Sequence, residues 1–106
     1  MSFRYVWEKS HEAVRSLALS DEPLATRLAR SLDALLRLQS EADFGSGDAR
    51  RHFEELVQQF GGSDTVATTT GAIERLDNDA LHRAAESILL LYSEVEREHG
   101  RRHGPS

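Results

Sequence analysis

Hydrophobic and polar residues alternate along this chain with the period of an α-helix. Between Phe3 and Leu19 the apolar residues recur three and four positions apart, which places them on one face of a helix. The residues at 20–23, Ser-Asp-Glu-Pro, combine capping side chains, acids and an early proline, and such residues are typical of a helix start. Leucines and alanines continue the pattern, so we expect a second helix from about Asp21 to Ser40.

The middle of the chain carries a third and shorter amphipathic segment. The residues at 45–47, Gly-Ser-Gly, break the pattern, and apolar residues on one face then predict a helix from Asp48 to Phe60. The pair Gly61-Gly62 is expected to end it in a left-handed conformation. Residues 63–70 are rich in threonine, but a single strand would have no partner here, so we expect a loop.

The last helix is the most hydrophobic segment of the chain. A short helix over 71–76 and the capping residues at 77–79 precede it, and we expect it to run from Asp79 to about His99, with Gly100 as its stop. The leucines at 89–91 extend its apolar surface nearly all around. Such a helix either lies at the centre of the fold or uses a second face for another contact.

These segments predict an all-α fold, a small antiparallel helical bundle of about four main helices. With 106 residues the chain suits one domain, which we expect to cover 1–100, followed by a polar C-terminal tail at 101–106. Among the large side chains we expect these in the core: Trp7, Leu17, Leu28, Leu32, Leu35, Phe53, Ile88 and Tyr92.

Composition narrows the classes of function. The chain has no cysteine, which excludes disulfides and thiol chemistry and suits a cytoplasmic protein. No apolar run approaches the ~20 residues of a membrane span, so we expect no membrane contact. There is no nucleophile elbow and no phosphate-binding loop, so we expect no enzyme activity.

Histidines and carboxylates give little support for a metal or cofactor. The His52 and Glu55 pair and the His82 and Glu86 pair lie off the apolar faces of their helices, where no buried metal cage forms. His99 and His103 are four apart and would chelate a divalent ion only if the last helix continued past Gly100. We therefore expect neither a metal nor a cofactor.

Nucleic-acid binding is the alternative function that the charges leave open. The formal net charge of −5 argues against a protein that binds nucleic acid through overall positive charge. All basic residues except Lys9 are nevertheless arginines, which suit recognition of phosphate. A small nucleic-acid-binding regulator would use Arg27, Arg30, Arg50 and Arg51 of the second and third helices.

Apolar residues outside the predicted core faces favour a different function. Leu90 shares the polar face of the last helix with Glu94 and Arg97, while Leu38 and Tyr5 depart from the apolar stripes of their own helices. We expect these five residues to contact another protein chain. The sequence thus favours a non-enzymatic interaction, adaptor or regulatory protein, which self-associates as a homodimer through its last helix.

Overall fold

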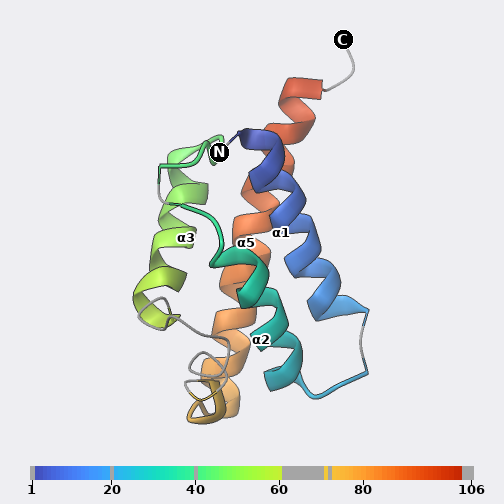
Figure 1. Ribbon diagram of the computed structural model, residues 1–106, viewed down its shortest axis with the longest axis vertical. Helices are drawn as coiled ribbons and strands as arrows, with labels where there is room; N and C mark the ends of the chain where they lie inside the picture. The colour runs from blue at the N-terminus through green and yellow to red at the C-terminus, as the bar shows by residue number, and fades with distance from the viewer. Residues whose placement is uncertain (1, 20, 40, 61–70, 72, 104–106) are drawn as a thin grey trace.

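The computed structural model describes residues 2–19, 21–39, 41–60, 71 and 73–103. Within these residues the long helices are α1 (Phe3–Ala18), α2 (Leu24–Leu35), α3 (Gly47–Phe60) and α5 (Asn78–His103), labelled as in Figure 1, and no strand occurs among them. Helices that follow one another in the chain run in opposite directions in Figure 1. The predicted all-α antiparallel bundle is therefore confirmed.

The longest helix, α5, is the element against which the others pack. It contacts α1, α2 and α3, and in Figure 1 it runs between α3 on the left and α1 on the right. Six of the predicted core side chains are buried in this arrangement: Leu17, Leu28, Leu32, Leu35, Phe53 and Ile88. Trp7 and Tyr92 are only partly buried, since they lie at the seam between α1 and α5.

Helix α2 is shorter than the sequence pattern predicts, and this changes the place of Leu38. The helix ends at Leu35, and the amide of Leu38 donates to the carbonyl of Leu35 at 3.0 Å in a tighter turn. The chain then bends inward, so that Leu38, Ala42 and Phe44 are buried in the core. The expectation that Leu38 is exposed for an intermolecular contact is wrong, because its side chain keeps only 5% of its accessible surface.

Helix α5 is longer than expected, because Gly100 does not stop it. The helix continues to His103, and Glu98 accepts hydrogen bonds from Arg101 at 2.6 Å and Arg102 at 2.9 Å. Basic side chains in the last turn also interact favourably with the helix dipole. Residues 101–103 are thus part of the last helix rather than of a separate tail, and 104–106 lie outside the described residues.

The expected capping side chain is confirmed at the start of α5, and a serine also caps α3, whereas Pro23 at the start of α2 makes no side-chain capping hydrogen bond. The Ser46 hydroxyl accepts a hydrogen bond from the amide of Ala49 at 3.1 Å, and the Asp77 carboxylate accepts one from the amide of Ala80 at 2.8 Å. The predicted end of α3 at Gly61-Gly62 and the loop at 63–70 lie outside the described residues.

None of the helices in the described ranges combines the length and the apolar character that crossing a membrane requires.

Candidate functional site

The most unusual surface of the bundle is the side of α5 that faces away from the other helices. Leu89 and Leu90 lie at its centre and keep 48% and 45% of their accessible surface. The outer face of α5 is the name used below for six exposed residues, Arg83, Glu86, Leu89, Leu90, Ser93 and Arg97, together with the partly buried Glu94. Because α5 is packed on its opposite side, these leucines remain outside a core that otherwise encloses Ile88 and Leu91.

Charged residues lie at equal spacings before and after Leu90 in the sequence. Glu86 and Glu94 lie four residues before and after Leu90, and Arg83 and Arg97 lie seven residues before and after it. Glu94 pairs with Arg97 at 3.4 Å within the helix. The outer face of α5 therefore has an apolar centre, an inner pair of acids and an outer pair of bases.

Three of the five predicted interface residues, Leu90, Glu94 and Arg97, lie together on this face. Tyr5 does not, since it lies on α1, is half-buried against the core and has the Lys9 ammonium 5.6 Å from its ring centroid. Leu38 is buried, as described above. Leu89 was not predicted as an interface residue, although its position next to Leu90 in a run of leucines was the signal for it.

The arginines of the nucleic-acid alternative have partners within the bundle. Arg27 donates to the carbonyls of Leu17 at 2.7 Å and Glu22 at 2.9 Å, so it joins the end of α1 to the start of α2. Arg50 donates to the carbonyl of Ala42 at 3.0 Å.

The two remaining arginines are more exposed and form ion pairs. Arg30 pairs with Glu22, and Arg51 lies 3.6 Å from Asp48 within α3. Since all four candidate arginines have a carbonyl or a carboxylate as partner, their arrangement gives the nucleic-acid alternative little support.

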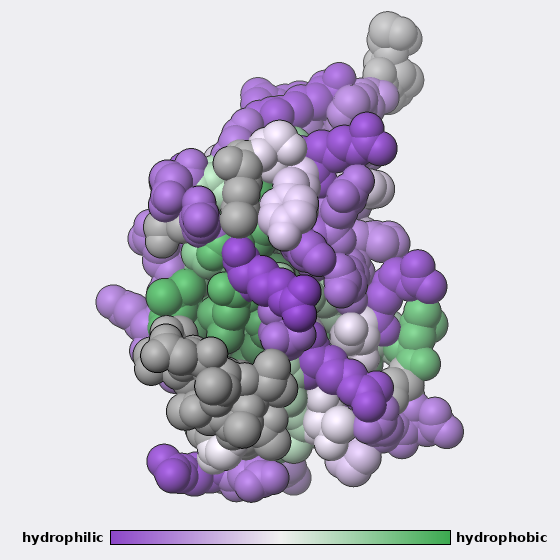
Figure 2. Space-filling view, in the orientation of Figure 1, coloured by the Kyte–Doolittle hydropathy of each residue, from purple (hydrophilic) through white to green (hydrophobic). Residues whose placement is uncertain are grey.

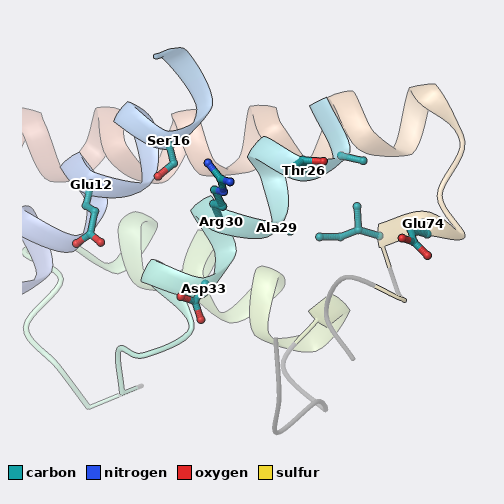
Figure 3. Close-up of a pocket in the computed structure, with 9 residues that line it drawn as sticks. Glu12, Ser16, Thr26, Ala29, Arg30, Asp33 and Glu74 are labelled. Atoms are coloured by element: carbon teal, nitrogen blue, oxygen red, sulfur yellow. The ribbon is translucent and has the colours of Figure 1, made fainter. Parts of the chain in front are cut away.

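A hollow of about 460 Å³ lies between α1, α2 and the segment before α5. Figure 3 shows the polar residues around it: Glu12 and Ser16 belong to α1, Thr26, Arg30 and Asp33 belong to α2, and Glu74 belongs to the segment before α5. The other residues that line the hollow are small or apolar: Ala25, Ala29 and Ile73.

The charges that line this hollow are largely neutralised by their neighbours. Glu12 pairs with Lys9 at 3.1 Å, Asp33 pairs with Arg37 at 3.1 Å, and Arg30 pairs with Glu22. The same side of the molecule is largely hydrophilic in Figure 2, with apolar side chains gathered between α2 and α3. Three of the four charged side chains that line the hollow thus have a partner of opposite charge, and Glu74 is the fourth.

A column of stacked rings follows the seam between α1 and α5. Trp7 lies between His11 and His99, and the His99 ring centroid is 4.6 Å from that of His103. Because α5 continues past Gly100, His99 and His103 lie on the same face of one helix, as a shared metal ion would require. Among the described side chains, however, no three or more histidines and carboxylates come together as a metal site.

Tyr92 joins the same seam through its phenol. Its hydroxyl oxygen lies 3.3 Å from Nδ1 of His11. Burial raises the pKa of Tyr92, and the hydrogen bond and negative charge of Glu96 raise it further. Because Glu96 also accepts from the Trp7 indole at 3.2 Å, these polar groups hold α1 to α5.

Neither a protein-family model, nor a curated protein sequence, nor a solved structure matches this chain.

Proposed function

We propose that this protein is a non-enzymatic protein-binding module that docks through the outer face of α5. The observation that carries the proposal is the pair Leu89 and Leu90, which are nearly half exposed at the middle of the longest helix. Scattered exposed leucines are common on protein surfaces. Two adjacent leucines with a polar rim are instead the pattern of an interface centre, where apolar area is covered and charges stay at the edge.

The other surfaces support competing functions less well. Arg27 and Arg50 donate to backbone carbonyls of the bundle, and Arg30 and Arg51 form ion pairs at the surface. Most charges that line the hollow beside α1 are also paired. Binding through the outer face of α5 also leaves the bundle undisturbed, because the two leucines contribute little to its core.

The test compares the full chain with two variants that carry the same substitution at different exposed leucines. Leu90→Glu places a charge at the centre of the proposed interface. Leu19→Glu places the same charge at the end of α1, where the leucine is 71% exposed, and is the matched control. Each tagged protein is expressed in the source organism and purified at moderate salt.

We expect a stoichiometric protein partner to co-purify with the unmodified chain and with Leu19→Glu, and to be lost with Leu90→Glu. Circular dichroism should show equal helicity for all three proteins. A partner retained equally by all three would place the binding surface elsewhere. Recovery of every variant without a partner would contradict the proposed function.

A further inference from the structure

His99 and His103 lie one turn apart at the end of α5, because the helix continues through Gly100 to His103. Their ring centroids are 4.6 Å apart. Metal–nitrogen bonds of about 2.0–2.1 Å at a tetrahedral angle set two imidazoles that share an ion roughly 5 Å apart, centre to centre. The two rings therefore stand close to the separation that a shared ion requires. Helical zinc sites use the same spacing of two histidines four residues apart.

Neighbouring side chains hold the ring of His99 in place. It lies against the Trp7 indole, with ring centroids 4.3 Å apart. Its Nδ1 lies 3.9 Å from the carboxylate of Glu96, which also accepts the Trp7 N–H at 3.2 Å. Metal-binding histidines commonly have a carboxylate beside the ring nitrogen that does not bind the ion. This arrangement leaves Nε2 of His99 for a ligand bond.

The last turn of α5, which carries His103, is held by Arg102. The Arg102 guanidinium donates to Glu98 at 2.9 Å and to Asp43 at 3.3 Å, and it lies 4.2 Å from the centroid of the Phe3 ring. His103 itself is exposed, so its ring can turn toward an ion without disturbing the core. A cation at the C-terminal end of a helix is also favoured by the helix dipole.

Both histidines line a hollow of about 570 Å³ between the start of α1 and the end of α5. Two arginines line the same hollow and would repel a cation, but each pairs with a carboxylate. Arg4 pairs with Glu8 at 3.2 Å, and Arg102 pairs with Asp43 at 3.3 Å. The hollow therefore has room for water molecules around an ion, and its positive charges are partly balanced.

The ligand set selects the class of ion. Neutral imidazoles suit Cu²⁺, Ni²⁺ and Zn²⁺, whereas Mg²⁺ and Ca²⁺ require oxygen ligands. No group of three or more histidines and carboxylates forms among the described side chains, so the site has two protein ligands and open positions. We propose that His99 and His103 bind one divalent transition-metal ion, Cu²⁺ in preference to Ni²⁺ and Zn²⁺, with water in the remaining positions. The site uses no residue of the outer face of α5, so it is independent of the proposed function.

The single tryptophan of the chain reports binding at this site. Trp7 stacks on His99, and Cu²⁺ quenches the fluorescence of a tryptophan that lies close to it. The full chain, without a histidine tag, is titrated with copper sulfate, zinc chloride and magnesium chloride. We expect saturable quenching by Cu²⁺. Cu²⁺ should also raise the temperature of unfolding, Zn²⁺ should raise it less, and Mg²⁺ should leave it unchanged, because an ion that binds the folded chain stabilises it.

Two substitutions of the same kind locate the site. His103→Gln removes one ligand and keeps the stack of Trp7 on His99. His82→Gln is the matched control, since His82 is an exposed histidine of α5 with no second histidine four residues away. Loss of a group that only orients a ligand weakens metal binding by about 10- to 100-fold, so loss of a ligand should weaken Cu²⁺ binding by at least about tenfold. His82→Gln should leave the affinity for Cu²⁺ unchanged.

Circular dichroism should show equal helicity for the three proteins, which separates loss of binding from loss of fold. If His103→Gln binds Cu²⁺ as tightly as the unmodified chain, the two histidines do not share an ion and the proposal is wrong. It is equally wrong if Cu²⁺ gives no saturable quenching, or if Mg²⁺ stabilises the chain as much as Zn²⁺ does. The co-purification experiment decides the proposed function separately in every case.

Discussion

The Trp7 indole on α1 stacks on the His99 imidazole on α5, with ring centroids 4.3 Å apart and ring planes 12° from parallel. The two residues are 92 positions apart in the chain, so their contact joins the first helix to the end of the last. Glu96 fixes the indole from a second direction by accepting its N–H at 3.2 Å. Trp7 is only partly buried, but its contacts with His99 and Glu96 join α1 to α5.

Replacing Trp7 should therefore weaken the whole bundle. We expect Trp7→Ala to lower the free energy of unfolding by about 2–3 kcal/mol, somewhat below the ~3–5 kcal/mol typical of a fully buried aromatic ring. His99→Ala should cost about 1 kcal/mol, because it removes one face of the stack. Urea unfolding followed by circular dichroism measures both values.

The double variant then tests whether the two rings stabilise each other. If the stack contributes as a pair, the loss in the double variant should be smaller than the sum of the single losses by about 0.5–1.5 kcal/mol. A sum that agrees within about 0.3 kcal/mol would show that the two rings act independently.

Gly45 is a position that no other residue fills without strain. Its φ is +85°, and a β-carbon there would approach the Glu98 side chain to 2.6 Å and the Phe3 ring to 3.3 Å. We expect Gly45→Ala to destabilise the protein by about 1–3 kcal/mol, because the backbone conformation disfavours a side chain and Glu98 would have to move. Thermal unfolding is a sufficient measurement.

Gly100 provides the matched control for this substitution. It lies inside α5, and nothing stands within 4 Å of a β-carbon added to it. Gly100→Ala should stabilise the protein by about 0.5–1 kcal/mol, since alanine is a better helix former than glycine. We therefore expect the substitution to lower the free energy of unfolding at Gly45 and to raise it at Gly100. A loss of stability at Gly100 would indicate that α5 ends before it.

The continuation of α5 through Gly100 is a feature that the sequence pattern did not predict. Periodicity correctly predicted the long helices and most core residues, because apolar spacing reflects which face is covered. It did not predict that α5 continues to His103. The ion pairs of Glu98 with Arg101 and Arg102 are local pairs within the helix, three and four residues apart. The ion pair of Arg102 with Asp43, in contrast, depends on the fold. Asp43 lies 59 residues before Arg102, and no local pattern announces such a contact.

The candidate site was predictable in part for a similar reason. An exposed Leu90 among charges follows from the helical wheel of α5 alone, and the structure agrees. The burial of Leu38 depends instead on where α2 ends, and helix ends are the least reliable feature of such patterns. Phe44, which is 1% exposed, enters the core only because the chain bends inward after that end.

Glu98 should make the stability of the protein depend on pH in acid. Hydrogen bonds from Arg101 and Arg102 lower the pKa of this carboxyl from its ordinary value of 4.5. A carboxyl whose pKa is lower in the folded state stabilises the protein fully above its unfolded pKa, and this contribution is lost as the pH falls through the folded pKa. We therefore expect the free energy of unfolding to decline below about pH 4.5.

Glu98→Gln should flatten that decline, because glutamine does not titrate. Glu54→Gln, which changes an exposed glutamate of α3, is the control and should leave the acid slope as it is. Urea unfolding at a series of pH values between 3 and 7 gives the two slopes. Equal slopes for the two variants would show that other carboxylates govern the acid stability.

Leu38 and Leu90 were both predicted to be interface residues, but they differ sharply in exposure. Leu38 keeps 5% of its surface and Leu90 keeps 45%. Leu38→Ala removes buried methyl groups and leaves a cavity, so it should cost about 2–5 kcal/mol. Leu90→Ala should change the free energy of unfolding by no more than about 0.5 kcal/mol, as substitutions on a surface usually do. Urea unfolding at low protein concentration measures both.

Concentration separates a surface leucine from an interface leucine in the same experiment. If Leu90 faces solvent in an isolated chain, its substitution has the same small effect at every protein concentration. A homodimer held together by Leu90 would instead unfold at higher urea as the concentration rises, and Leu90→Ala would remove that dependence. An unfolding midpoint that stays the same at every protein concentration would show that Leu90 does not hold a homodimer together.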